Sequence, residues 1–370
     1  MCEPHCLTAK SQLIMNIKVT LKGMAIAASL FTTNLFAQDA AKPAEAPLTI
    51  SGQVDAYYRA TNNKVNGSRT SYTLQQGGIG LGMANVAIAK DNGKIGFVAD
   101  LMFGTRAEET NYPYSGSSSF VKQLYITYKP TEKLKFTAGN FMTFVGYELV
   151  EAANNLNYSM SYNYTNGPFY HTGLKMDIAF TDKFAGMIGV FNQTDSKGYY
   201  GLKSGFEYLD TKKKMVGGQL SYVSGPFKIY VNGLSGKGAD STLATTFDIT
   251  TSYQVTEKFG AGFNFITQSL SKESDKASWN GSALYLNYAF SPKFTLAARG
   301  ELFNDKDGVK YIATDNTITA FTLSGNIKID AFTIVPEIRF DSAKQTIWID
   351  DAGKAKDSEL SFILAAIYKF

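Results

Sequence analysis

Side chains suited to catalysis or metal binding are few in this sequence. Cys2 and Cys6 precede any cleavage point, and His171 is the sole histidine beyond residue 37. A hydrolase needs a nucleophile, a base and an orienting group within mutual reach, so a lone histidine favours a hydrogen-bonding role at a strand end. Residues 305–308 (Asp-Lys-Asp-Gly) and 350–353 (Asp-Asp-Ala-Gly) lack the full ligand spacing of a calcium loop. We therefore expect no enzyme activity, no cofactor and no metal.

Another set of polar residues suits contact with ions or solutes. The segment 145–168 is rich in Asn, Tyr and Ser. A connection of that length is usually functional or disordered, and its tyrosines argue against disorder. The segment either packs over the rim of the fold or folds into its interior, and we expect the interior. Its candidate constriction residues are then Glu148, Glu151, Asn154, Asn155 and Tyr158.

The elements that must position these residues follow an N-terminal export signal. Two lysines precede 24–36, an apolar stretch, and Ala37 is a small residue at the expected cut. This order is typical of a secretory signal, and the apolar stretch is too short for a spanning helix, which needs about 20 residues. We predict a cleaved signal peptide over 1–37, with Met15 as an alternative start, and a periplasmic linker over 38–47.

From residue 48 onward, apolar residues alternate with polar ones. In the stretch 332–342, Ile338 and Phe340 share one face, whereas Glu337 and Arg339 share the other. A period of two gives each strand one apolar and one polar face. Seven short turns alternate with eight longer polar connections, which predicts about 16 antiparallel strands. The longer connections lie at 61–70, 105–117, 145–168, 195–213, 237–242, 271–277, 305–316 and 343–356.

Short turns on one side and long loops on the other are typical of an outer-membrane barrel. A soluble sandwich would place a turn after every 8–12 residues or so and would have both ends alike. Lipid offers no hydrogen-bond partners to an open sheet edge, so a spanning sheet must close. We predict an all-β, closed antiparallel transmembrane β-barrel over 48–370. Its strand number is about 16, within a range of about 14 to 18.

Several stretches of this pattern resemble a known family, the OmpL-like β-barrel porins of Gram-negative outer membranes. The motifs are 139–143 (Gly-Asn-Phe-Met-Thr), 146–148 (Gly-Tyr-Glu), 157–159 (Asn-Tyr-Ser), 167–168 (Gly-Pro) with 171–173 (His-Thr-Gly), and 217–222 (Gly-Gly-Gln-Leu-Ser-Tyr) with 225–228 (Gly-Pro-Phe-Lys). The resemblance implies a diffusion channel with no catalytic residues. It also implies that Tyr368 and Phe370 form the C-terminal signal read by the outer-membrane assembly machinery. A homotrimer is usual for porins of this strand number.

The inward faces of the predicted strands carry both signs of charge, and the formal net charge of the chain is +4. A near-neutral balance predicts no nucleic-acid partner. Charged rings of one sign confer ion selectivity, so a mixed wall predicts no strong selectivity unless its charges pair across strands. We expect passive diffusion of ions and small hydrophilic solutes. A substrate-specific channel and a non-conducting barrel with an adhesin or structural role are the alternatives. The pore-lining candidates are Asp55, Arg59, Asp100, Lys175, Asp177, Arg299, Glu301, Glu337 and Arg339.

Overall fold

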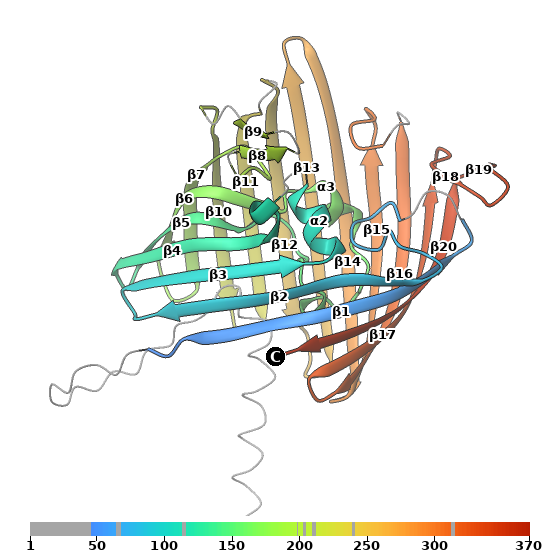
Figure 1. Ribbon diagram of the computed structural model, residues 1–370, viewed down its shortest axis with the longest axis horizontal. Coiled ribbons are helices and arrows are strands. Elements are labelled where there is room, and N and C mark those ends of the chain that lie inside the picture. Colours follow the sequence, from blue (N-terminus) through green and yellow to red (C-terminus); the bar gives the residue numbers. More distant parts are fainter. Residues whose placement is uncertain are drawn as a thin grey trace, which may run out of the picture. The chain divides into compact units, whose positions relative to one another are not determined.

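The protein forms one closed antiparallel barrel of 16 strands (Figure 1). The computed structural model describes residues 46–370 apart from 64–67, 113–115, 198, 203–204, 209–211, 239–240 and 312–314. The predicted signal peptide and residues 38–45 of the predicted linker lie outside the described residues. The predicted fold class and the predicted strand number are both confirmed.

The barrel strands follow one another around the wall in chain order. They are β1 (Thr49–Thr61), β2 (Ile79–Asp91), β3 (Ile95–Phe103), β4 (Val121–Thr131), β5 (Leu134–Met142), β6 (Tyr170–Ala179), β7 (Phe184–Phe191), β10 (Met215–Ser224), β11 (Phe227–Lys237), β12 (Leu243–Gln254), β13 (Phe259–Lys272), β14 (Asp275–Ser291), β15 (Phe294–Asp305), β16 (Asn316–Ile329), β17 (Phe332–Ala343) and β20 (Ser358–Lys369).

The remaining elements lie in the long connections. Two small hairpins pair β8 (Tyr199–Leu202) with β9 (Gly205–Tyr208) and β18 (Trp348–Ile349) with β19 (Ala355–Lys356). The helices are short: α2 (Thr105–Asn111), α3 (Tyr162–Asn166) and the 3-10 turns η1 (Gly116–Phe120) and η2 (Ala152–Asn154). None of the described helices is long and apolar enough to cross a membrane.

The barrel closes between its first and last strands. β1 pairs with β2 along one edge and with β20 along the other. At the end of this seam, Gly52 and Phe370 exchange two backbone hydrogen bonds of 3.0 Å. The closure satisfies backbone groups that lipid could not satisfy.

The outer wall is apolar, as the alternation predicted. In β20, Phe362 and Leu364 are 44% and 45% exposed on the outside, whereas Ile363 and Ala365 are each 1% exposed on the inside. The inner face of this strand is therefore also apolar. It packs in a cluster with Tyr158, which belongs to the connection between β5 and β6. The connection between β5 and β6 therefore packs against the inner face of the wall at this point.

The seven predicted short turns are present, at 92–94, 132–133, 180–183, 225–226, 255–258, 292–293 and 330–331, but the long connection predicted at 271–277 is wrong. β13 ends at Lys272 and β14 begins at Asp275, with Ser271 paired opposite Lys276 (Figure 1). Glu273, with φ of 55°, lies in the turn. The polar residues that suggested a loop belong to strands that project beyond the apolar belt. There both faces meet water, so the polar composition does not end the strand.

Candidate functional site

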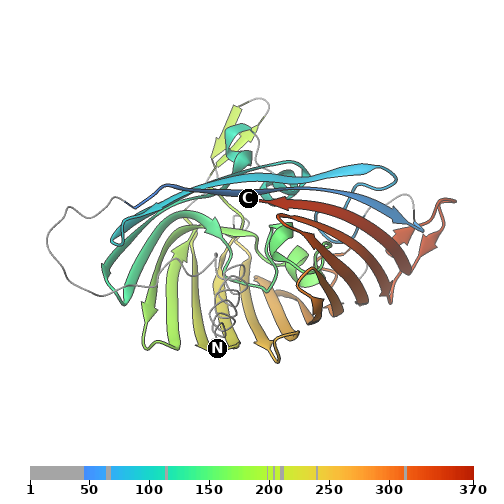
Figure 2. The same ribbon diagram turned by 90° about the horizontal axis from the view of Figure 1, so that it is seen from below.

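The connection between β5 and β6, residues 143–169, lies inside the barrel, and we call it the inward loop. Its ends are joined by a 3.0 Å hydrogen bond from the Thr143 amide to the Phe169 carbonyl. Its helix α3 lies within the ring of strands in Figure 2. Ser161 caps α3, since its Oγ accepts a 3.0 Å hydrogen bond from the Tyr164 amide. The segment 145–168 singled out in the sequence forms nearly all of this loop.

Two arginines of the wall hold the inward loop from β15 and β17. Arg299 is 0% exposed, and its Nη1 donates to Glu148 (2.6 Å) and to the Ser159 carbonyl (2.7 Å). Its Nε donates to Glu301 at 2.8 Å. Arg339 donates to the Met160 carbonyl at 2.8 Å. The structure thus brings two predicted pore-lining arginines against the inward loop, and one of them, Arg299, directly against the predicted constriction carboxylate Glu148.

Wall carboxylates accept backbone N–H groups of the same loop. Glu337 accepts from Tyr158 (2.6 Å) and Ser159 (3.0 Å). Glu301 accepts the Tyr162 amide at 2.7 Å. The backbone N–H groups of a loop have no neighbouring strand to bond. These carboxylates therefore provide the hydrogen-bond acceptors that the buried N–H groups would otherwise lack. The loop is therefore fixed in part through its main chain.

Further contacts join the loop to the neighbouring strands β20 and β1 and, across the barrel, to β4. Tyr158 Oη donates to Asp55 at 2.6 Å. Glu151 is ion-paired with Lys122, whose Nζ lies 2.5 Å from Asp100. Lys369 donates to Asn154 Oδ1 at 2.9 Å. The loop therefore spans the interior from one wall to the other.

Three of the predicted residues lie away from the inward loop, and a fourth, Asn155, lies in the loop but bonds only within it. Arg59 pairs with Glu359 on the adjacent strand and donates to Gln76, without meeting the loop. Lys175 and Asp177 pair with each other at 2.9 Å on β6. Asn155 turns back on its own loop, where its side chain bonds the backbone of Leu149. Its role is thus to shape the loop.

Two contributors were missed by the sequence analysis, and a third was marked only as an inward-facing position. Arg106, from α2, is 0% exposed and donates to the Val150 (3.1 Å) and Tyr158 (3.3 Å) carbonyls. It sits in a polar connection, where no periodicity marks an inward side chain. Lys122 is the β4 residue skipped by a register shift between β3 and β4. The shift reverses which residues of the strand point inward, so simple alternation places Lys122 on the wrong face. Asp248, on the inner face of β12, accepts the Gly146 amide at 3.2 Å; its place in the alternation did mark it as inward.

The end of the inward loop is tied to the next extracellular connection by Asp195. This carboxylate accepts the amides of Phe169 (2.7 Å) and Tyr170 (3.0 Å). Burial raises the pKa of Asp195 to about 6, although the two N–H groups oppose the shift. Lys197 lies over the Tyr170 ring at 4.6 Å, and burial lowers its pKa to about 7. At Glu151, burial raises the pKa but the neighbouring Lys122 outweighs it, so the pKa is lowered.

No group of three or more His, Cys, Asp or Glu side chains in the described part of the chain could hold a metal ion. His171 is buried on β6, and its Nε2 lies 3.0 Å from Thr143 Oγ1 at the start of the inward loop. Charged and polar groups therefore meet here to position a loop within a barrel.

Comparison with known proteins agrees with this geometry. Residues 47–370 match the family described as "Putative beta-barrel porin-2, OmpL-like". The chain belongs to this family. It is an outer-membrane porin, a channel for passive diffusion of ions and small hydrophilic solutes. Family and fold point to a channel rather than to an enzyme.

Solved structures share the fold of this porin at low sequence identity. An anion-selective porin from Comamonas acidovorans is 11% identical, with a TM-score of 0.60 over 88% of this chain and 100% of its own. OprB of Pseudomonas putida is 12% identical, with a TM-score of 0.58 over 88% and 94%. The trimer form of OmpT from Vibrio cholerae is 13% identical, with a TM-score of 0.56 over 88% and 100%. No curated protein matches the sequence.

Proposed function

We propose that the inward loop forms the constriction of this porin and so limits the size of the solutes that pass. The observation that carries the proposal is the set of contacts that joins the loop to strands on nearly opposite sides of the barrel, such as Glu151 with Lys122 on β4 and Asn163 with Asn264 on β13. A 16-stranded barrel without such a loop would leave a wide aqueous channel. Glu148, Glu151, Asn154 and Tyr158 are the constriction residues in this proposal, and Asn155 supports them.

A reporter cysteine in the loop tests the proposal. The sequence after residue 37 contains no cysteine, so a single introduced thiol can be modified selectively. Leu156, which is 37% exposed, is suited to this change. We expect Leu156→Cys to lose about half of its single-channel conductance when a bulky charged thiol reagent is added. Lys272→Cys, at the tip of the β13–β14 hairpin, is the matched control. Equal conductance before and after modification of Leu156→Cys would refute the constriction.

A substrate-specific channel and a non-conducting barrel would each give recordings that differ from those of a general diffusion channel. A substrate-specific channel would show saturable block of the ion current by its solute, whereas general diffusion would not. A barrel with an adhesin or structural role would carry no current in a planar bilayer. Single-channel recordings in salts of different ion size therefore separate the three functions.

Export and assembly complete the proposal. We infer that residues 1–37 are removed on export, that the barrel inserts into outer-membrane lipid and that it assembles as a homotrimer. OmpT of Vibrio cholerae, which shares the fold, has a trimer form. Tyr368 and Phe370 are 49% and 52% exposed on the outside of the last strand, where the assembly machinery could read them.

Removing the Phe370 ring leaves both of its backbone hydrogen bonds to Gly52 possible. Phe370→Ala should therefore refold in detergent as the wild type does, yet reach the outer membrane in several-fold lower amount.

A further inference from the structure

The charged side chains on the inner wall fall into two sets that differ in contact with water. The first set is buried and rich in carboxylates. Its members are each at most 8% exposed and are held in the ion pairs and hydrogen bonds of the wall and the inward loop. The carboxylates are Asp55, Asp100, Glu148, Asp248, Glu301, Glu337, Asp341 and Glu359, and the cations are Arg59, Arg106, Lys122, Arg299 and Arg339.

The second set keeps contact with water and is rich in lysine. Strand register and side-chain contacts place six partly or fully exposed lysines on the inner face. They are Lys129, Lys135, Lys175, Lys228, Lys328 and Lys369. In the described wall and inward loop, the carboxylates that match this exposure are Asp91, Asp177 and Glu151.

Each of these three carboxylates already has a lysine partner. Asp177 lies 2.9 Å from Lys175 and 3.4 Å from Lys135. Asp91 lies 3.6 Å from Lys129, and Glu151 pairs with the buried Lys122. A permeating cation would have to compete with these pairs. The net charge of the water-accessible side chains in the lumen is therefore positive, although positive and negative side chains are nearly equal in number when the buried ones are included.

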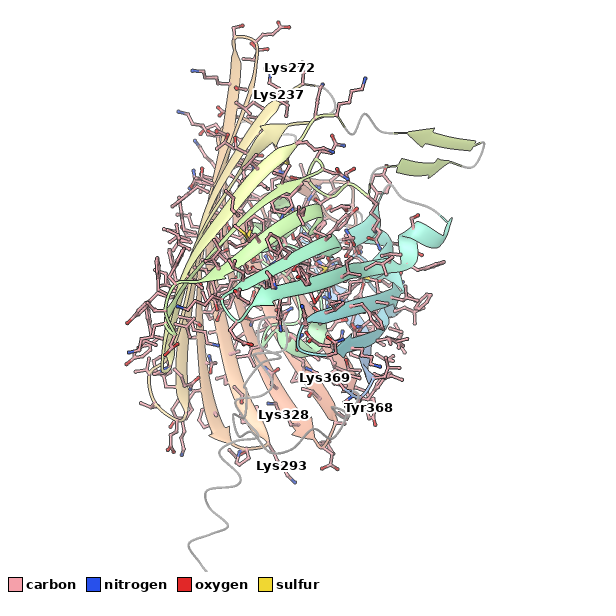
Figure 3. All side chains as sticks on the ribbon, turned by 90° about the vertical axis from the view of Figure 1, so that its left-hand side faces the viewer. Lys237, Lys272, Lys293, Lys328, Tyr368 and Lys369 are labelled. Carbon is pink, nitrogen blue, oxygen red and sulfur yellow. The ribbon has the colours of Figure 1, made fainter. Side chains whose placement is uncertain are left out.

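The accessible lysines gather between the inward loop and the short turns. Lys228 is the second residue of β11, and Lys328 is the residue before the last of β16. Figure 3 places Lys328 and Lys369 near the end opposite Lys237 and Lys272. Short turns face the periplasm in outer-membrane barrels. The lysines thus line the periplasmic part of the lumen, which we call the lysine vestibule.

We propose that this porin prefers anions to cations and that the lysine vestibule sets this preference. Charges of one sign around a pore confer ion selectivity, and small inorganic and organic anions are the solutes that the vestibule would concentrate. The inward loop contributes by burying the carboxylates of the wall in its own anchoring contacts. The inference rests on the proposed diffusion of ions through the barrel, and it adds the class of solute.

The test is the reversal potential of the refolded full barrel in a planar bilayer under a KCl gradient. We expect a chloride-to-potassium permeability ratio of at least about 3 in 0.1 M salt. A single charge a few ångströms from the ion path in water changes ion partitioning by about threefold. Lys228→Gln with Lys328→Gln should therefore lower the ratio several-fold. The ratio should also fall as salt rises, because screening shortens the reach of each charge to about 3 Å at 1 M.

Two controls separate charge from folding. Lys228→Arg with Lys328→Arg keeps both charges and should retain the wild-type ratio. Lys272→Gln removes one lysine far from the vestibule and should leave the ratio unchanged (Figure 3). A conducting wild type with a ratio at or below one, or a glutamine double variant with the wild-type ratio, would overturn the anion preference alone. A barrel that carries no current would overturn the proposed diffusion and this inference together.

Discussion

Replacement of Glu148 by Gln tests how firmly the inward loop is held. Glu148 is 6% exposed; one carboxylate oxygen accepts from Arg299 (2.6 Å), and the other accepts from the amide (2.8 Å) and the hydroxyl (2.6 Å) of Ser161. The glutamine amide has one oxygen, so it can serve the arginine or the serine but not both. The substitution therefore keeps the size of the side chain and removes about half of its acceptor capacity.

The expected cost follows from these contacts. A hydrogen bond to a charged group contributes about 1.5–3 kcal/mol, and a buried polar group left unpaired costs about 1–3 kcal/mol. Arg299 keeps Glu301 at 2.8 Å as a partner, which limits the penalty on its side. We expect local destabilisation of the loop by about 2–4 kcal/mol in total. Since 1.4 kcal/mol is a factor of ten, local opening should rise by about 30- to 1,000-fold.

Amide hydrogen exchange of the barrel in detergent micelles measures this opening. The reporter is the Ser161 amide, which donates to Glu148. Glu132→Gln, an exposed residue of the β4–β5 turn, is the matched control because it makes the same chemical change away from the loop. Exchange at Ser161 that stays within about threefold of the wild type would refute the anchoring role that we assign to Glu148. Equal acceleration in both variants would show a general loss of stability instead.

Three further perturbations have expected outcomes. Glu151→Gln leaves Lys122 without one of its two carboxylates, so the chloride-to-potassium ratio should rise by about threefold, and a fall in the reversal-potential measurement would contradict this. The pKa of Asp195 is raised to about 6 in the folded protein. The stability that its protonated form contributes is therefore fully present below about pH 4 and is lost as the pH rises through 6. Asp195→Asn should remove that pH dependence from amide exchange at the end of the inward loop, and retention of the wild-type profile would exclude Asp195 as its source. Gly139 has φ of 133°, and a Cβ there would collide with the Leu124 carbonyl oxygen. Gly139→Ala should therefore lower the free energy of unfolding by about 1–3 kcal/mol, which is measured as a lower urea midpoint. Gly233→Ala, where a Cβ meets nothing within 4 Å, is its control and should refold like the wild type.

Strand positions were predictable because alternation is a local property. Side chains of successive residues point to opposite faces of a strand whatever the rest of the chain does. The outward set of β20, such as Phe362 and Leu364, and the inward set of β17, such as Glu337 and Arg339, could therefore be read directly. The exception at 271–277 has the same cause. Where a strand leaves the apolar belt, its alternation of polarity ends although its pairing continues.

The contacts of the inward loop could not be predicted in the same way, because they join residues far apart in the chain. Glu148 meets Arg299 across 151 positions, and Tyr158 meets Glu337 across 179. Such pairs depend on the diameter of the closed barrel and on the path of the loop through it. Arg106 shows the limit most clearly, since nothing in its local sequence indicates a buried side chain.

By itself, the sequence determined the closed barrel, its strand number, the apolar outer wall and the existence of a long tyrosine-rich connection after β5. It also determined that both signs of charge line the lumen. Only the tertiary structure decided which of those charges stay in contact with water. Burial of a charge depends on whether partners arrive from distant segments to replace its hydration, and those partners assemble only when the barrel closes around the inward loop.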